Sequence, residues 1–208
     1  MATMARVSQA HLDARRRQIL DGAVRCFSRN GFHATSMQDV LRESGLSAGA
    51  VYRYFASKDD IIRAIAVEVV DTIRSAYAEA AGASPRPTPD ALLSTVLDRV
   101  FHMAAGGDDP LVSTRLILQV WAETQRNEDL AAALRAGFAA LHELWSGLVQ
   151  EYQQDGRLPA DVPAADLARI LIATAQGLIA QQALFGDVDP SAIGAALRAV
   201  LRPAAPAQ

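Results

Sequence analysis

The spacing of the apolar residues constrains the fold of this chain more than any other feature. They recur every three or four positions, and no stretch sustains an alternation of apolar and polar residues. The first period is that of one face of an α-helix, whereas alternation is typical of a half-buried strand. Hydrophobic residues make up 50% of the 208 residues and aromatic ones 6%, and Ala is abundant, which favours helix and supplies a sizeable core. We therefore expect an all-α protein.

Turn-forming residues divide this pattern into about nine helical segments. Thr35-Ser36 and Ser47 are candidate N-caps near the start, and a Pro-, Gly- and Ser-rich linker occupies 82–89. The expected helices lie at about 13–29, 35–43, 47–55, 58–81, 89–105, 110–126, 127–154, 164–185 and 190–201. Three short helices thus precede a long connecting helix and a larger helical bundle.

Charge is distributed unevenly along the chain, although the formal net charge is only −3. Residues 1–58 carry nine Lys or Arg and four Asp or Glu, whereas the remaining 150 residues carry 11 and 19. A basic module joined to an acidic part is typical of a protein that binds a polyanion at one end only. Chance clustering of solvated side chains would give the same counts, so charge alone leaves both interpretations open.

Several classes of protein are disfavoured by what the sequence lacks. The single cysteine, Cys26, cannot build a disulfide framework or a CxxC zinc site, and Asp98 with His102 is too small a set to hold a metal. No HExxH, GxSxG or phosphate-binding loop occurs, so a helical enzyme is a weak alternative, and neither a metal nor a cofactor is expected. No run of 18 apolar residues predicts a membrane span, and the polar, basic start predicts no secretory signal, so we expect a cytoplasmic protein.

The segment 35–55, TSMQDVLRESGLSAGAVYRYF, has the layout of a helix-turn-helix. Two short helices flank a tight turn at Gly45, and the second opens with small residues, Ser47 to Ala50, which allow close approach to a groove floor. The run Tyr52 to Tyr54 follows and can reach phosphates. Because the segment lies in the basic part of the chain, we interpret it as a DNA-binding motif whose second helix enters the major groove.

The run RRRQILDGAVRCFSRNGFHATSMQDVLRESGLSAGAVYRYFASKDDII resembles the N-terminal domain of TetR-family transcriptional regulators. The matching positions are Ile19, Leu20, Ala23, Phe27, Gly31, Thr35, Gly45, Ser47, Ala48, Gly49, Val51, Tyr52, Tyr54, Phe55, Ser57 and Lys58. Beyond this run the resemblance concerns length and helical architecture only. It implies a three-helix helix-turn-helix domain over 10–58, an effector-binding and dimerisation domain over 59–202, and flexible tails at 1–9 and 203–208.

The resemblance also implies which residues contact DNA. Tyr52 and Lys58 would contact phosphates, as would the hydroxyls at 35 and 36, and Gln38 would read a base edge. Because the side chains at 48–50 are short, we expect specificity to depend on Gln38, Arg53, thymine methyl groups and DNA shape. The expected DNA-contacting residues are Thr35, Ser36, Gln38, Ser47, Ala48, Gly49, Tyr52, Arg53, Tyr54 and Lys58.

The last two helices would form a four-helix interface with a second copy, as the resemblance implies, although an ordinary intrachain core is the alternative. The expected interface residues are Leu167, Ile170, Leu171, Thr174, Leu178, Gln181, Phe185, Ile193, Leu197 and Val200. Two such copies would place two recognition helices on one palindrome.

The middle helices are expected to enclose an effector pocket. Large aromatic residues with a few amides suit a mostly apolar ligand that carries one or two polar groups, although core packing is the alternative for each residue. No basic cluster occurs in this part of the sequence, so we expect a neutral or cationic effector rather than a highly anionic one. The candidate pocket residues are Phe101, His102, Met103, Leu116, Gln119, Val120, Trp121, Phe138, Leu141, Trp145, Thr174, Gln176 and Leu178.

Together these features predict a homodimeric DNA-binding repressor that a small effector releases from a palindromic operator. The leading alternative is a constitutive or architectural DNA-binding protein. The sequence pI near 5.8 disfavours that alternative, because such proteins usually carry a large positive excess.

Overall fold

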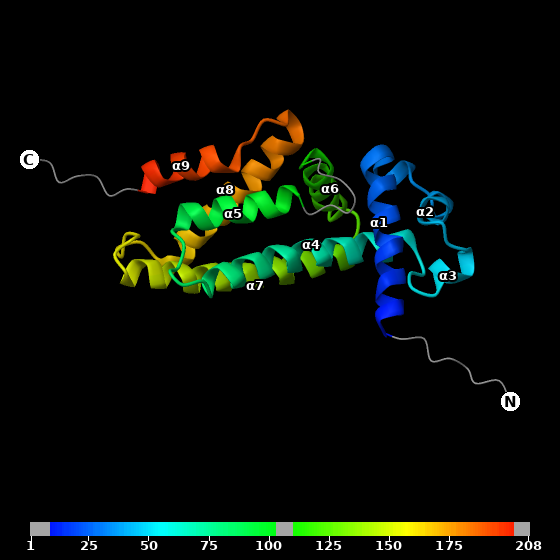
Figure 1. The fold of residues 1–208 in the computed structure, drawn as a ribbon, viewed down its shortest axis with the longest axis horizontal. Coiled ribbons are helices and arrows are strands. Elements are labelled where there is room, and N and C mark those ends of the chain that lie inside the picture. Colours follow the sequence, from blue (N-terminus) through cyan, green and yellow to red (C-terminus); the bar gives the residue numbers. More distant parts are fainter. Residues whose placement is uncertain (1–8, 103–109, 202–208) are drawn as a thin grey trace, which may run out of the picture. The chain divides into compact units, whose positions relative to one another are not determined.

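The computed structural model describes residues 9–102 and 110–201, and within these ranges it contains nine helices and no strand (Figure 1). The helices are α1 (Gln9–Ala34), α2 (Met37–Ser44), α3 (Ala48–Tyr52), α4 (Lys58–Ala81), α5 (Pro89–Phe101), α6 (Pro110–Glu123), α7 (Glu128–Gln154), α8 (Ala164–Phe185) and α9 (Pro190–Leu201). The all-α class and the order of the helices, both expected from the apolar spacing, are confirmed.

Several helix ends differ from the expected ones. The regular helix of α1 ends at Gly31, as expected, because the backbone there is non-helical, with φ 77 and ψ 168; the short helical segment to Ala34 that follows this kink is counted in α1. α5 ends before 105, because His102 is its C-cap, with a backbone bond from its N–H to the carbonyl of Asp98. α6 ends before 126 because the backbone at 124–127 forms turn hydrogen bonds, after which Asn127 caps α7 by accepting from the N–H of Leu130 at 2.9 Å. These differences follow from local turns that apolar spacing does not report.

The described residues divide into two compact units, and the boundary between the units falls inside α4. We call residues 9–65 the head and residues 66–201 the body. In the head, α2 packs closely on α1, since a Cβ on Gly22 of α1 would lie 3.1 Å from backbone atoms of Ser44. Phe27 and Phe32 meet edge to face, with ring centroids 4.7 Å apart. The buried apolar side chains of the head include Ile19, Leu20, Ala23, Phe27, Phe32, Val40, Val51, Phe55, Ile61 and Ile62.

The body is a bundle in which α8 packs on α6 and α7, and α5 packs on α9. Its core surrounds Trp145, whose ring lies edge to face with Tyr77 at a centroid distance of 4.5 Å. Burial raises the pKa of the Tyr77 hydroxyl. By length and composition alone α8 would pass as a membrane span, but it packs against α6 and α7 as part of this bundle.

A part-buried ion pair joins α5 to α9. Arg198 Nη2 lies 2.7 Å from Asp90 Oδ2, and the Asp90 side chain is only 4% exposed. Burial alone would raise the pKa of Asp90, but hydrogen bonds from Thr88 and Arg198 outweigh it and hold that pKa below its ordinary value. The carboxylate is therefore kept charged by its partners at neutral pH.

Candidate nucleic-acid interface and body cavity

The helix-turn-helix of the head begins with a reciprocal cap on α2. The Ser36 hydroxyl accepts from Asp39 N at 3.2 Å, and the Asp39 carboxylate accepts from Ser36 N at 2.9 Å and from the Ser36 hydroxyl at 2.7 Å. These bonds from Ser36 lower the pKa of Asp39, and Arg42 contacts the same carboxylate. The sequence therefore fixes where α2 starts through contacts within four residues.

The turn and α3 follow from equally local signals. Gly45 ends α2 in the left-handed region at φ 67, a backbone conformation that favours glycine. Ser47 then caps α3 by accepting from Ala50 N at 3.3 Å. Val51 is fully buried, whereas the Tyr52 side chain is 50% exposed. One face of α3 therefore anchors it in the head, and the other presents Tyr52 outward.

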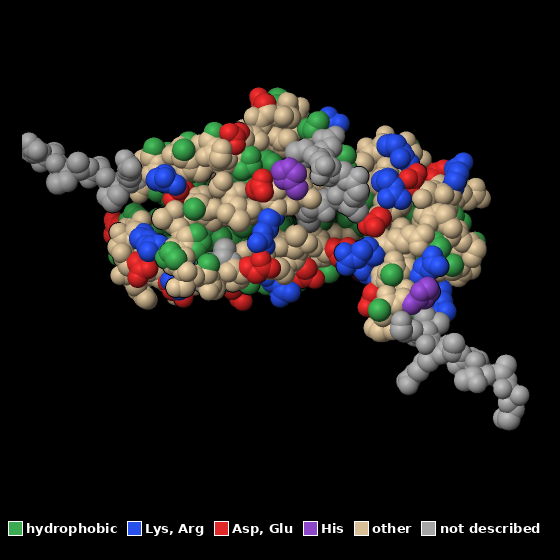
Figure 2. All heavy atoms as spheres, viewed as in Figure 1, with side chains coloured by type: hydrophobic (Ala, Val, Ile, Leu, Met, Phe, Trp, Pro, Cys, Tyr) green, Lys and Arg blue, Asp and Glu red, His purple; other side chains and the backbone are tan. Residues whose placement is uncertain are grey.

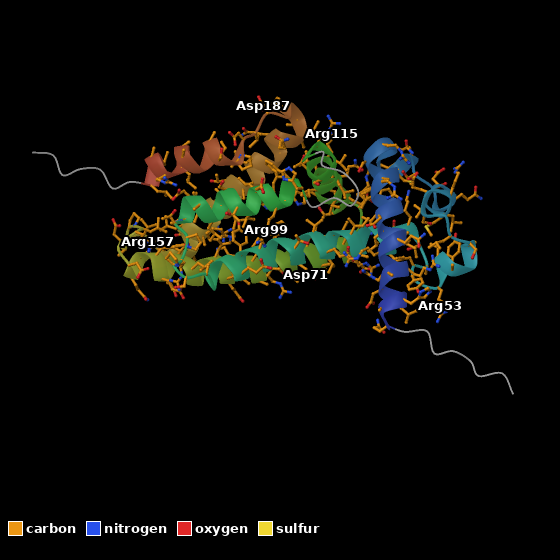
Figure 3. The ribbon with its side chains drawn as sticks, viewed as in Figure 1. Arg53, Asp71, Arg99, Arg115, Arg157 and Asp187 are labelled. Atoms are coloured by element: carbon orange, nitrogen blue, oxygen red, sulfur yellow. The ribbon has the colours of Figure 1, made fainter. Side chains whose placement is uncertain are left out.

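Some of the charged side chains around this motif form ion pairs, and others do not. Arg25 Nε lies 2.7 Å from Glu43 Oε1, and Arg29 Nη2 lies 2.5 Å from Glu43 Oε2, so α2 is tied to α1. These two bonds lower the pKa of Glu43. Arg53, at the end of α3, is exposed and forms no ion pair within the described part of the chain (Figure 3). Several Lys and Arg side chains lie over the visible face of the head (Figure 2).

Two side chains that the sequence assigned to phosphate contacts are engaged inside the head. Thr35 is 2% exposed, and its hydroxyl donates to the carbonyl of Gly31 at 2.8 Å. The Lys58 ammonium donates to the carbonyls of Phe32 and Thr35 at 2.6 and 3.0 Å. Lys58 thus holds the end of α1 and the start of α2 against the start of α4.

A small hollow of about 160 Å³ lies beside α3 in the head. It lies between the start of α1 and the helix-turn-helix. Tyr54 forms part of its wall and is only partly exposed. Its lining residues are His11, Leu12, Arg15, Leu46, Ala50, Arg53 and Tyr54.

Two adjoining hollows lie among the described residues of the body. The larger, which we call the groove, has a volume of about 730 Å³ and is lined by Trp121, Thr124, Ala131, Leu134, Arg135, Phe138, Ala139, His142, Glu143, Arg169, Ile172, Ala173 and Gln176. The smaller, which we call the inner cavity, has a volume of about 40 Å³ and is lined by Ala66, Val69, Val70, Ile73, Tyr77, Val96, Leu97, Val100, Ile117, Val120, Trp121, Leu134, Phe138, Leu141, Ile172, Ala175, Gln176 and Ile179. Residues such as Trp121 and Phe138 line both, so an apolar boundary separates the groove from the inner cavity.

Several large apolar side chains of α8 and α9 are exposed. Ile170, Leu184 and Phe185 of α8 are 63%, 67% and 70% exposed, and Val200 of α9 is 79% exposed. Soluble proteins seldom leave several large apolar side chains this exposed unless another surface covers them. We call these four residues the outer apolar face.

Comparison with known proteins relates both parts of the chain to one family. Residues 19–65 match the family of bacterial regulatory proteins of the tetR type, and residues 89–205 match the C-terminal part of BetI-type transcriptional repressors. The second match alone covers more than half of the chain. The chain belongs to the TetR family.

Relatives and solved structures agree with this membership. The transcriptional regulator YfiR of Bacillus subtilis is 30% identical over 191 residues, covering 88% of this chain and 87% of the relative. The transcriptional repressor Rv1474c of Mycobacterium tuberculosis is 30% identical, covering 93% and 95%. Salmonella enterica GusR superposes with a TM-score of 0.71 at 25% identity, over 94% of this chain and 96% of that one. FadR of Bacillus subtilis, solved in complex with stearoyl-CoA, shares the fold with a TM-score of 0.70 at 20% identity, over 89% and 96%. This TetR-family chain is therefore a DNA-binding transcriptional regulator and not an enzyme.

The structure places the predicted DNA-contacting residues of this TetR-family head in different surroundings. Gln38, Ser47, Ala48, Gly49, Tyr52 and Arg53 are exposed, as a DNA contact requires. Thr35 is the exception, because its buried hydroxyl already donates inward and cannot reach a phosphate. Ser36 is exposed but engaged in its cap, and Lys58 is engaged by two carbonyls. Spacing alone could not reveal these inward bonds.

The predicted pocket residues of the TetR-family body divide between the hollows and the core. Trp121, Phe138 and Gln176 line both hollows, and Val120 and Leu141 line the inner cavity. The other buried pocket candidates pack in the core and line neither hollow: Phe101, Leu116, Trp145 and Leu178. Gln119, His102 and Thr174 also lie outside both hollows, and Met103 lies outside the described residues.

The sequence missed most of the actual lining, which includes residues of α4 and α5 and the charged residues of α7 and α8. Apolar positions on α4 and α5 look like ordinary core in a sequence, and no local signal marks them as cavity walls. Arg135 and Arg169 lie far apart in the sequence, on α7 and α8. That both line the groove is therefore visible only in the folded structure.

The predicted interface residues also divide between two faces. Leu171 and Leu178 are buried inside the chain, at 4% and 7% exposure, so they cannot meet a second copy. Leu167, Ile193 and Leu197 are partly buried against the same core. Ile170, Gln181, Phe185 and Val200 are exposed, and Leu184, which is not among the predicted interface residues, is exposed as well.

Proposed function

We propose that this regulator is a homodimeric repressor that leaves a palindromic operator when a small effector binds in the body. The observation that carries the proposal is the outer face of α3, where short side chains at 47–49 lie beside the exposed Tyr52 and Arg53. The functional division that goes with it is a DNA-binding domain over 10–58 and an effector-binding and dimerisation domain over 59–202. Its expected location is the cytoplasm, where the operator would be accessible.

The chemistry of α3 suits a major-groove contact. Ala48 and Gly49 add little bulk, so the start of the helix can approach base edges closely. Ser47 accepts a capping bond from Ala50, which leaves its hydroxyl proton available to a phosphate oxygen. Arg53 carries a cation that no described acidic group neutralises, and Tyr52 offers a second donor to the backbone.

The outer apolar face supports a symmetric dimer. Ile170 and Leu184 stand on one side of α8, about four turns apart by the helical repeat, and Phe185 extends the same face. Burying such side chains against an identical face stabilises a twofold pair, because each residue then contributes twice. A dimer would present two α3 helices to the two halves of a palindrome.

The groove supports an effector site in the body. Its volume of about 730 Å³ lies within the usual range for small-molecule sites, roughly 300–1,000 Å³. The structural neighbour FadR was solved with stearoyl-CoA, which is a precedent for ligand binding by this fold. An effector would lower DNA affinity only if it binds more tightly to the arrangement that does not fit the operator.

DNA binding is tested by fluorescence anisotropy with the intergenic DNA upstream of the protein's own gene and with scrambled DNA of equal length. We expect sequence-dependent binding that Arg53→Gln weakens about tenfold for each copy bound, as the loss of one charge-assisted contact per copy would. Arg74→Gln is the matched control, since Arg74 is exposed on α4 and paired with Asp71. Equal affinity for both DNAs, also after selection from random sequences, would favour the constitutive or architectural alternative.

Dimerisation is tested by analytical ultracentrifugation of the full chain. Ile170→Asp and Leu184→Asp each place a charge on the outer apolar face and should yield monomers. Val67→Asp is the control, because Val67 is an exposed apolar residue of α4 outside that face, at 43% exposure. Unchanged dimers in both α8 variants would refute the proposed interface.

A further inference from the structure

The charges and the apolar walls of the groove together restrict which effector it can take. We propose that the effector is an amphipathic anion, with an acidic group held by Arg169 and Arg135 and an apolar part directed toward Trp121 and Phe138. This inference rests on the proposed function only in taking the groove as a small-molecule site. It departs from the neutral or cationic effector that the sequence favoured, because folding brings together basic residues that the sequence keeps apart.

Two cationic side chains line the groove, and one of them has no partner. Arg169 of α8 is exposed and forms no ion pair or hydrogen bond with the described residues. Arg135 of α7 pairs only with Glu128 of the same helix, at 2.5 Å, and those two side chains are 64% and 81% exposed. Such an exposed pair holds its arginine weakly, so Arg135 can turn to a stronger anionic partner. A carboxylate between two guanidinium groups would form the charge-assisted bonds that Arg169 lacks.

Among the described residues Glu143 is the one acidic residue that lines the groove, and it lies about two turns of α7 from Arg135. His142 Nε2 is 3.0 Å from the carbonyl of Ala165, which aligns this turn of α7 with the start of α8. Arg169 follows Ala165 by about one turn of α8, and it lines the same groove as Arg135. Among the described residues the groove lining therefore carries two arginines and one glutamate, which leaves it net positive.

The apolar part of the ligand follows from the boundary between the groove and the inner cavity. Of the described residues around the inner cavity, only Tyr77, Trp121 and Gln176 have polar side-chain atoms, so water gains little by entering. At about 40 Å³ this cavity admits only a small group, whereas the groove beside it is large enough for a whole ligand. An apolar chain lying on Trp121 and Phe138, with its end at the inner cavity, would displace poorly bound water from both.

The test uses three probes that share one apolar chain and differ in the head group: decanoate, decanol and decyltrimethylammonium, each below its micelle concentration. Binding to the full-length protein without DNA is measured by calorimetry and by tryptophan fluorescence, since Trp121 lines both hollows. We expect decanoate to bind about tenfold more tightly than decanol, and decyltrimethylammonium to bind most weakly. Arg169→Gln should remove that preference for decanoate without weakening decanol, and Arg135→Gln should reduce it. Arg74→Gln, outside both hollows, should change nothing.

The outcomes separate this inference from the proposed repressor function. Equal binding of decanoate and decanol, or tightest binding of the cation, would overturn the anionic head group whatever the DNA assay shows. A preference for decanoate that Arg169→Gln leaves intact would overturn the assigned site. Decanoate binding that weakens as the protein concentration rises would mean that a second copy occupies the groove, which also overturns the proposal. Decanoate binding without release of DNA would leave the anion site standing and contradict only the effector role.

Discussion

Replacing Lys58 by methionine would show whether this lysine positions the helices of the head or contacts DNA. Its ammonium donates to the carbonyls of Phe32 and Thr35 at 2.6 and 3.0 Å, which joins α4 to the end of α1 and the start of α2. The resemblance to the family instead implied a phosphate contact. Methionine keeps an unbranched apolar stem of similar length, so Lys58→Met removes the donors with little change in packing.

The expected loss of stability follows from the two bonds. A hydrogen bond to a charged group contributes about 1.5–3 kcal/mol. Here both bonds share one ammonium on a part-buried side chain, where solvent screens part of the interaction. We therefore expect the free energy of unfolding of the head to fall by about 2 kcal/mol. Arg42→Met is the control, since Arg42 is 77% exposed and pairs only with Asp39, and it should cost well under 1 kcal/mol, as an exposed pair does.

Urea denaturation followed by two probes measures this loss. Both tryptophans, Trp121 and Trp145, lie in the body, so their fluorescence reports the body, while circular dichroism reports all helices. The Lys58→Met variant should shift the circular dichroism transition and leave the fluorescence transition in place. The slope of log affinity for DNA against log salt should also stay unchanged, whereas one lost phosphate contact per copy would lower it by about 0.9 for each copy. Unchanged stability with a reduced slope would refute the positioning role.

Three further predictions concern packing and charge. Gly137→Ala should destabilise the body by about 1–2 kcal/mol in urea denaturation, because the new Cβ would lie 2.6 Å from a valine methyl of α4. Gly147→Ala on the same helix meets nothing and should stabilise the body by about 0.5–1 kcal/mol. A gain in stability from both substitutions would contradict the close contact between α7 and α4 at Gly137. Hydrogen bonds from two arginines lower the pKa of Glu43, so its charge stabilises the head at neutral pH. That contribution is lost as the pH falls through the lowered pKa. In acid titrations Glu43→Gln should therefore flatten the dependence of the free energy of unfolding on pH. Arg198→Met should cost about 2 kcal/mol at pH 7 by leaving Asp90 charged and unpaired, and the additional change Asp90→Asn should recover most of it, a recovery that thermal melts would detect.

The sequence predicts the head better than the body because the signals of the head are local. Ser36 with Asp39, Gly45 and Ser47 set the start of α2, the turn and the start of α3 within a few residues of one another. The exposed positions of α3 follow from the same short pattern. Thr35 differs because its hydroxyl bonds to a carbonyl of the preceding kink, which forms only once α1 bends at Gly31. A polar side chain at a helix start could face either way, and the sequence alone does not say which.

α8 shows why the predictions for the body mixed different surfaces. Its apolar residues surround the helix, so at about 100° per residue no single stripe stands out. Leu171 and Leu178 point into the core, Ile172 and Gln176 toward the groove, and Ile170 outward. The predicted interface took residues from the first and third of these faces, because hydrophobicity alone cannot separate a face that meets the same chain from one that meets another. Since the outward face shares no residue with the groove, a charge at Ile170 should disrupt assembly while leaving decanoate binding intact, and loss of both together would show that the faces are coupled.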